Sequence, residues 1–276
     1  MSTDRPSPDP SPPVRVRFLI GTKRGLTVAD EVARELPAGV EAFATLVNVR
    51  PERPLASLKI DRIGHPDPEG CEIAADLLDP FERPKVSRLR QACQSAGIAR
   101  VVYRNPRWER HPLDRWVEVR SLQGAVDAVT SVARNAMIAL PEADVFKFNS
   151  VGGLRFSVRS EAPPTLTNLP PRFQFHVVGE AVSVEAERLL LQKCKAQALI
   201  TRETGALPEQ KLVIAARQLD LPVILIRRPI ERPEIPARSA PILLEWIVSH
   251  LTAREGSDQS LPGQELTKRT PQLPPG

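Results

Sequence analysis

The 276-residue sequence lacks the features that mark membrane and secreted proteins. No apolar run reaches the roughly 18 residues that a transmembrane helix needs, and the N-terminus has no apolar core of the signal-peptide type. The three cysteines (Cys71, Cys93 and Cys194) are far apart and form no C-x-x-C pair. We therefore expect a cytoplasmic protein whose cysteines are reduced and mostly buried.

Several kinds of functional site are missing as well. Aromatic residues make up only 4% of the chain and the basic residues are dispersed, so nucleic-acid binding is disfavoured. The four histidines show no metal-ligand spacing, and neither a G-x-S-x-G elbow nor a catalytic cysteine signature is present. We expect no metal site and no membrane partner, and no residue is assigned as catalytic. The net charge of +5 suits an anionic small ligand.

Proline, by contrast, is abundant. The chain has 29 prolines, about twice the usual ~5%, and many of them lie near the ends. Residues 1–13 and 253–276 are rich in proline and polar residues and have no hydrophobic period, which predicts disordered tails. The segment between these tails is long enough for two ordinary domains.

Between the tails, apolar runs alternate with amphipathic patterns of helical period. Strands that alternate with helices indicate parallel sheets with helices on their faces. We therefore predict an α/β protein with two Rossmann-like lobes, residues 14–140 and 141–252, which meet near residues 139–144. The expected strands cover residues 14–20, 40–49, 73–78, 99–103, 115–119, 144–148, 155–160, 173–179, 197–201 and 222–229, and the expected helices cover residues 26–36, 84–96, 122–133, 183–195 and 208–219.

Ligands of parallel sheets bind at the carboxyl ends of the strands, so the turns there are candidate sites. The turn Gly21-Thr22-Lys23-Arg24-Gly25 follows the first apolar run. Its glycines let a phosphate approach the backbone, Thr22 offers a hydroxyl, and Lys23 and Arg24 add positive charge at a helix N-terminus. Neither G-x-G-x-x-G nor a Walker P-loop is present, so an ordinary strand-to-helix turn explains this segment equally well.

A second turn, Thr201-Arg202-Glu203-Thr204-Gly205, has the same anatomy. Thr204 is suited to cap the following helix, Gly205 permits a tight backbone, and Pro208 suits the first helical turn. A plain capped loop explains all three. A structural cap does not require Arg202, which places a rigid fork of hydrogen-bond donors at the end of a buried strand.

The order and spacing of these motifs resemble the precorrin-6A reductases of cobalamin biosynthesis, including their cobalt-precorrin relatives. The first turn resembles the family's G-T-x-E-[AG], with Arg24 in place of the usual acid. The segment from Asp76 to Phe81 resembles D-A-T-H-P-[FY], with Leu78 and Asp79 in place of Thr and His. The second turn resembles T-K-[ND]-S-G-G, and the most specific match is the block that follows it, Lys211 to Pro229.

The resemblance implies a cleft between the lobes, NADPH as hydride donor, and reduction of one ring double bond of precorrin-6A or its cobalt form. It implies a cofactor-binding first lobe and a tetrapyrrole-binding second lobe. An alternative is a non-catalytic tetrapyrrole- or nucleotide-binding paralogue, because Leu78, Asp79 and Arg202 depart from the family motifs. The implied cofactor-binding residues are Gly21, Thr22, Lys23 and Arg24, and the implied substrate-binding residues are Asp79, Pro80, Phe81, Thr201, Arg202, Thr204, Gly205 and Lys211. The oligomeric state is left open.

Overall fold

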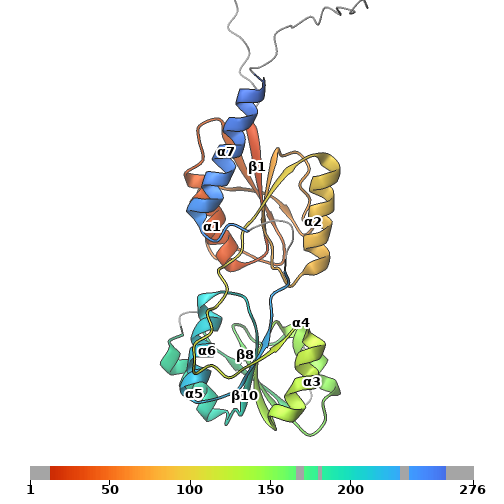
Figure 1. The fold of residues 1–276 in the computed structure, drawn as a ribbon, viewed down its shortest axis with the longest axis vertical. Coiled ribbons are helices and arrows are strands. Elements are labelled where there is room, and N and C mark those ends of the chain that lie inside the picture. Colours follow the sequence, from red (N-terminus) through yellow and green to blue (C-terminus); the bar gives the residue numbers. More distant parts are fainter. Residues whose placement is uncertain (1–12, 166–170, 180–181, 231–235, 259–276) are drawn as a thin grey trace, which may run out of the picture.

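A computed structural model describes residues 13–165, 171–179, 182–230 and 236–258. These residues form two α/β lobes stacked along the long axis of the molecule (Figure 1). Each lobe contains one sheet, and every pairing between the named strands is parallel. The predicted fold class is therefore confirmed.

The sheet of the first lobe has five strands in the order β3-β2-β1-β4-β5. The central strand β1 pairs with β2 on one side and β4 on the other. Its last five residues are buried, which explains why its sequence becomes continuously apolar instead of alternating. The strands are β1 (Val14–Ile20), β2 (Val40–Leu46), β3 (Lys59–Ile63), β4 (Ile73–Leu77) and β5 (Ala99–Val102).

Helices cover both faces of this sheet. α1 (Lys23–Arg34) and α7 (Ala240–Asp258) pack on one face, where they form a single apolar core with alternate residues of β1. α2 (Arg83–Ala96) packs on the other face against Leu19 and Leu78. As predicted, α2 ends at Gly97, whose φ of 64° is left-handed.

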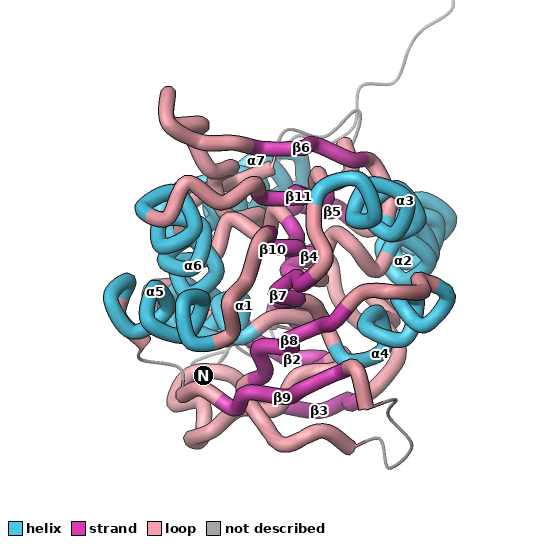
Figure 2. The backbone as a smooth tube through the Cα atoms, turned by 90° about the horizontal axis from the view of Figure 1, so that it is seen from below, coloured by secondary structure: helices cyan, strands magenta, loops and turns pink. Residues whose placement is uncertain are grey.

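The sheet of the second lobe has six strands in the order β6-β11-β10-β7-β8-β9. In Figure 2 this row of strands lies between α5 and α6 on one side and α3 and α4 on the other. The strands are β6 (Trp116–Val119), β7 (Asn135–Ala139), β8 (Arg155–Ser160), β9 (Phe173–Val177), β10 (Ala198–Arg202) and β11 (Val223–Ile226). The helices are α3 (Leu122–Val132), α4 (Glu142–Val145), the 3-10 helix η1 (Phe146–Ser150), α5 (Val184–Lys193) and α6 (Leu207–Gln218).

The chain passes between the lobes twice, and this corrects the boundary expected after residue 140. It crosses first between β5 and β6, so β6, α3 and β7 belong to the second lobe. It crosses again after β11, and α7 packs on the first lobe. Hydrophobic periodicity shows that a segment is a strand but does not show which sheet the strand joins, which explains the error.

The predicted C-terminal tail also needs correction. Residues 253–258 belong to α7, whereas the rest of that tail and residues 1–12 of the N-terminal tail lie outside the described residues. α7 has 19 residues and is the longest helix in the described parts of the chain. No helix in those parts is long and apolar enough to cross a membrane.

One predicted strand is wrong. Residues 144–148 were expected to form a strand, but they form the end of α4 and the start of η1. Val145 and Phe148, three residues apart, are both fully buried against α3 and the sheet, which is a helical spacing. Two strands, β7 and β3, were not predicted. The sequence of β7, NAMIA, is buried in its middle and has no alternation to reveal it.

The return of α7 to the first lobe leads to a stability prediction. Leu243 of α7 is fully buried in the first-lobe core. Leu243→Ala should lower the free energy of unfolding in urea by about 2–5 kcal/mol through the cavity that it leaves. Its neighbour Ile242 is 51% exposed, so Ile242→Ala should change it by less than about 0.5 kcal/mol. Equal effects of the two substitutions would contradict the packing of α7.

Candidate functional site

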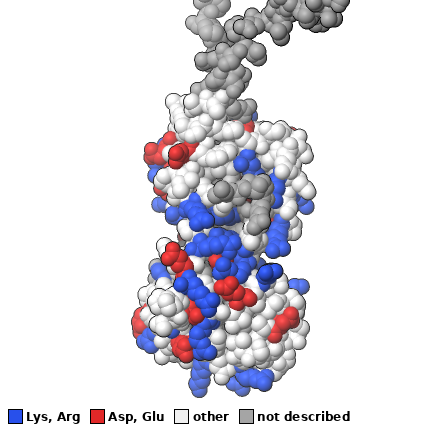
Figure 3. Space-filling model, in the orientation of Figure 1, with Lys and Arg blue, Asp and Glu red and all other residues white. Residues whose placement is uncertain are grey.

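The carboxyl edges of the two sheets face each other at the junction between the lobes. Lys23 follows β1, and its Nζ lies 3.1 Å from Oε2 of Glu161, which follows β8. Arg202 ends β10, and its Nη1 lies 3.6 Å from Oδ2 of Asp79, which follows β4. Basic side chains gather around this junction on the face shown in Figure 3. The two turns singled out in the sequence therefore meet at one place.

The first-lobe turn begins helix α1 in a form suited to an anion. Thr22 is the N-cap, and its hydroxyl accepts a hydrogen bond of 3.0 Å from the Gly25 amide. The first turn of α1 contains no acidic residue, so the positive end of the helix dipole is not neutralised from within the helix. A Cβ on Gly21 would lie 2.9 Å from the Asp79 amide nitrogen, so this position needs glycine for backbone packing.

The two basic residues of this turn differ in their surroundings. Lys23 pairs with Glu52 at 3.3 Å and with Glu161 at 3.1 Å. Burial alone would lower the pKa of Lys23, but hydrogen bonds and attraction from Glu161 and Glu52 raise it above its ordinary value. Arg24 is exposed. The turn therefore carries two permanent cations near neutral pH, one of them already held by carboxylates.

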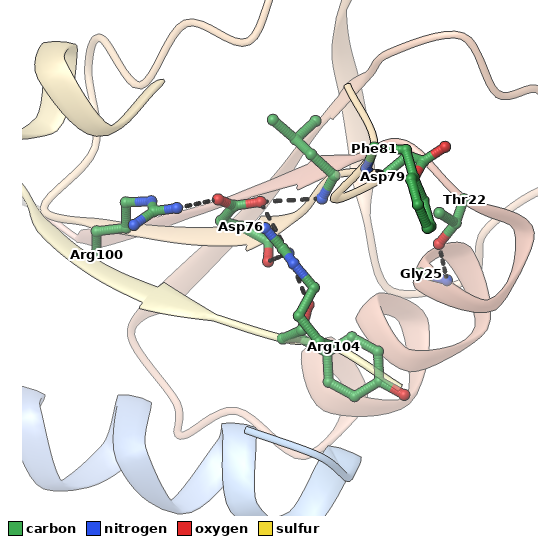
Figure 4. Close-up of polar contacts among 9 residues, drawn as sticks. Thr22, Gly25, Asp76, Asp79, Phe81, Arg100 and Arg104 are labelled. Atoms are coloured by element: carbon green, nitrogen blue, oxygen red, sulfur yellow. Dashed lines mark hydrogen bonds and ion pairs between the residues drawn. The ribbon is translucent and has the colours of Figure 1, made fainter. Parts of the chain in front are cut away.

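The neighbouring turn, residues 78–82, is anchored by a buried carboxylate. Asp76 is fully buried and lies between Arg100 and Arg104 (Figure 4). Its Oδ1 accepts hydrogen bonds from the Leu78 amide at 3.0 Å and from Arg104 Nη1 at 3.2 Å. Burial would raise the pKa of Asp76, but the charges of Arg104 and Arg100 outweigh it and the pKa is lowered. Asp76 thus fixes the backbone where the turn begins.

Residues 79–81 extend from this anchor toward the second lobe. Asp79 Oδ1 accepts a hydrogen bond of 2.9 Å from the Phe81 amide, which closes the turn around Pro80. The Phe81 ring packs on the apolar core of the second lobe, and the Arg202 guanidinium lies 4.7 Å from the ring centroid. This stacking adds a cation–π attraction to the ion pair between Arg202 and Asp79.

Arg202 is the central cation of the junction. Besides Asp79, it pairs with Asp144 of α4, which the sequence did not identify as a site residue. Burial raises the pKa of Asp144; Arg202 opposes this rise, and the nearby carboxylates of Asp79 and Glu82 add to it. Two carboxylates therefore share one arginine. Predicting Asp144 would have required the strand end of β7, which was not recognised.

The other residues of the second turn have mainly structural contacts. Thr201 is fully buried and its hydroxyl donates to the Ala139 carbonyl, so it offers no surface to a ligand here. We expected Thr204 to cap α6, but the N-cap is Ala206. The Thr204 hydroxyl accepts a hydrogen bond of 3.1 Å from the Ala206 amide. Lys211 lies one turn along α6, where its charge acts on Glu187 of α5.

A separate groove lies on the first lobe, away from the junction. This groove has a volume of about 680 Å³ and is lined by residues of β1, β2 and β3, including Arg15, Arg17 and Phe43. It lies beside the amino-terminal half of β1, whereas ligands of parallel sheets bind at the carboxyl ends. We therefore place the candidate site at the junction. In the described parts of the chain, no three His, Cys, Asp or Glu side chains gather as metal ligands do.

Gly205 gives a direct test of the geometry of the second turn. Its φ is +74°, and an added Cβ would lie 2.2 Å from the Pro106 carbonyl oxygen. Gly153 has nearly the same φ, +73°, with no atom within 4 Å of an added Cβ. We expect Gly153→Ala to cost about 1–2 kcal/mol of unfolding free energy from backbone strain, and Gly205→Ala to cost about 1–3 kcal/mol more from overlap. Urea unfolding of both variants measures the difference, and equal losses would refute the close approach.

The lowered pKa of Asp76 predicts a loss of stability in acid. A carboxyl whose pKa is lower in the folded protein stabilises it above the unfolded pKa of about 3.9 and loses this effect as pH falls through the folded value. Asp76→Asn should therefore cost about 3–5 kcal/mol at pH 7, because it leaves two arginines short of a buried counter-charge, and should flatten the decline of stability below about pH 4. Urea unfolding between pH 2 and 7 measures both effects.

The matched control for this experiment is Asp220→Asn. Asp220 pairs with Arg115 at 3.1 Å, but both side chains are more than half exposed. Its removal should cost less than about 1 kcal/mol and leave the acid decline as it is in the unmodified protein. If the free energy of unfolding of Asp76→Asn falls with decreasing pH as steeply as that of the control, the role of Asp76 is contradicted.

Comparison with known proteins connects this arrangement with one family. The family model described as precorrin-6x reductase CbiJ/CobK matches residues 68–247. The chain is 26% identical over 224 residues to the precorrin-6A reductase of Rhodococcus erythropolis, covering 78% of this chain and 89% of that protein. It is also 26% identical over 186 residues to the precorrin-6A reductase of Rhodobacter capsulatus, covering 66% of this chain and 72% of that protein.

A cobalt-precorrin relative and a solved structure agree with this match. The cobalt-precorrin-6A reductase of Methanothermobacter thermautotrophicus is 29% identical over 179 residues, covering 59% of this chain and 56% of that protein. A solved structure of the CobK precorrin-6A reductase superposes with a TM-score of 0.75 and 21% sequence identity, covering 86% of this chain and 97% of that one. At this identity the structural likeness shows the fold.

Proposed function

The chain belongs to the precorrin-6x reductase CbiJ/CobK family of cobalamin biosynthesis, and from that premise we propose that it reduces a ring double bond of precorrin-6A, or of its cobalt form, with NADPH. The observation that carries the proposal is the meeting of two cation-bearing turns, around Lys23 and Arg202, at the facing edges of the two sheets. The first lobe would bind the hydride donor and the second lobe the tetrapyrrole.

The first-lobe turn fits the phosphate groups of a dinucleotide. The first turn of α1 contains no acidic residue, and Lys23 and Arg24 stand at its start. Gly21 and Thr22 shape this turn, although the Thr22 hydroxyl already accepts the capping hydrogen bond. When bound, NADPH supplies a hydride, and the task of the protein is to bind and orient it. Lys23 would exchange Glu161 or Glu52 for a phosphate oxygen.

The second-lobe turn fits a carboxylate of the macrocycle. Arg202 has five N–H donors in a rigid fork, so it can keep Asp144 and still bind a carboxylate in place of Asp79. Asp79 and the turn around Pro80 would orient the guanidinium, and the Phe81 ring would offer an apolar surface to the macrocycle. Thr204 and Gly205 would shape the backbone beside it. Arginine stays protonated, so Arg202 binds and orients and does not deliver a proton.

Holding the donor and the macrocycle on facing turns is itself a source of rate enhancement. Fixing two reactants in a reactive geometry replaces an encounter in solution with a step inside one complex. The two lobes meet through Lys23–Glu161, Arg202–Asp79 and the packing of Phe81, so the turns are already close without ligands.

Two substitutions should separate the two binding roles. In anaerobic assays with precorrin-6A and NADPH, Arg202→Gln should raise KM for the macrocycle roughly 10- to 100-fold, since a hydrogen bond to a charged group contributes about 1.5–3 kcal/mol. Lys23→Gln should raise KM for NADPH only about two- to fivefold, because Lys23 is half exposed and screened. Each variant should leave the other KM within about a factor of two.

Arg115→Gln is the control, because Arg115 is exposed and pairs with Asp220 away from the junction. It should leave both KM values unchanged. An unmodified protein that binds the macrocycle and NADPH in calorimetry without oxidising NADPH would favour the non-catalytic alternative, which the departures at Leu78, Asp79 and Arg202 motivate. If the protein binds neither the macrocycle nor NADPH, the proposed function and the non-catalytic alternative are both refuted.

A further inference from the structure

The second-lobe turn rests directly on the two linkers that join the lobes. We define linker 1 as residues 103–115 and linker 2 as residues 227–239, of which 231–235 lie outside the described parts. A Cβ on Gly205 would lie 2.2 Å from the Pro106 carbonyl oxygen, and Asn105 Nδ2 donates to the Thr204 carbonyl at 3.4 Å. The turn that carries Arg202 therefore has no space to shift toward linker 1.

One buried carboxylate holds this turn to both linkers. Glu203 follows Arg202 and is fully buried. Its Oε2 accepts from Arg107 Nη1 of linker 1 at 2.6 Å and from the Arg228 amide of linker 2 at 3.2 Å. Its Oε1 lies 3.3 Å from Arg227 Nη1 of linker 2. Burying a carboxylate is costly unless cations and hydrogen bonds compensate it. Among the described residues, the groups that compensate Glu203 come from the two linkers.

The linkers are also tied to each other beside Glu203. Arg107 Nη2 donates to the Arg228 carbonyl at 3.1 Å, and Arg228 Nη1 donates to the Asn105 carbonyl at 2.7 Å. Closer to the first lobe, the Arg104 amide donates to the Ala237 carbonyl at 2.9 Å. The described parts of the two linkers are thus hydrogen-bonded to each other at both ends, and Glu203 joins them to the turn.

We propose that Glu203 is a positioning residue that couples the arrangement of the inter-lobe linkers to the position of Arg202. A rotation of the lobes about the linkers moves Arg107, Arg227 and Arg228, and Glu203 passes this movement to its neighbour Arg202. Arg202 in turn contacts Asp79 of the opposite lobe. The consequence for catalysis rests on the proposed function, in which Arg202 binds a carboxylate of the macrocycle.

The test compares two isosteric substitutions of buried, ion-paired carboxylates in the full-length protein. Glu203→Gln keeps the shape of the side chain but removes the charge that faces Arg107 and Arg227. The control is Asp114→Asn, which removes a buried charge of linker 1 that pairs with Arg217 of α6 at 2.7 Å and does not contact the turn. Arg107→Lys is a milder change, which removes the guanidinium that donates to both Glu203 and the Arg228 carbonyl. It replaces Glu203→Gln in the test if that variant fails to fold.

The kinetic readout separates positioning from general destabilisation. Glu203→Gln should raise KM for precorrin-6A at least tenfold, and Arg107→Lys should raise it by a smaller factor in the same direction. KM for NADPH should stay within twofold, because the first-lobe turn does not contact Glu203. Asp114→Asn should lose stability and keep both KM values. An unchanged KM for precorrin-6A in Glu203→Gln, or an equal rise in Asp114→Asn, would overturn the proposal.

A second readout needs no substrate and keeps the coupling testable if the proposed function fails. In unliganded Glu203→Gln, amide hydrogen exchange should be about tenfold faster than in the unmodified protein. This increase should occur in residues 203–206 and in residues 104–107 alike. Asp114→Asn should leave the exchange of residues 203–206 unchanged. Faster exchange in only one of the two segments, or in neither, would overturn the coupling, whatever reaction the protein catalyses.

Discussion

The structure depends on one geometric constraint: two all-parallel sheets face each other by their carboxyl edges. Parallel pairing gathers the strand ends of each sheet at a single edge, and the turns after β1, β4, β8 and β10 therefore converge. Facing edges bring the N-termini of α1 and α6 and the basic side chains of the turns to one junction. This arrangement places Lys23 beside Glu161 and Arg202 beside Asp79.

The same constraint explains where the buried charges lie. Asp76 and Glu203 are both fully buried, and each stands next to a turn of the junction. Both are held by arginines from the segments that leave or join the first lobe, Arg104 for Asp76 and Arg107 for Glu203. Buried ion pairs contribute little net stability, and their better-supported role is to specify one geometry. Here that geometry is the shape of two turns and the path of the linkers.

Much of this was predictable from the sequence, and the failures have physical causes. Long amphipathic helices such as α1 and α6, and the strand that ends before Gly21, show clear patterns, so both candidate turns were placed at strand ends. β7 was missed because a strand buried in the sheet centre lacks alternation. Residues 144–148 misled because a short apolar segment does not distinguish a strand from a helical turn, and Val145 and Phe148 have helical spacing. The boundary between lobes failed because α7 and the linkers are long-range features that no local pattern encodes.

The charge partners were beyond sequence analysis for a related reason. Asp144, Glu161 and Arg107 reach the junction only after both sheets have formed, and nothing in their local sequence distinguishes them from surface residues. Family membership supplies the reaction class. Under the proposed function, the contacts of Lys23 and Arg202 are the ion pairs that would exchange partners when ligands bind.

The most direct test of the account is a crystal structure of the protein with NADP⁺ and the macrocycle. We expect that structure to show phosphate groups at the N-terminus of α1 beside Lys23 and Arg24, and a macrocycle carboxylate bound to Arg202. Either ligand bound instead in the groove beside Arg15, Arg17 and Phe43, with the junction unaltered, would contradict it.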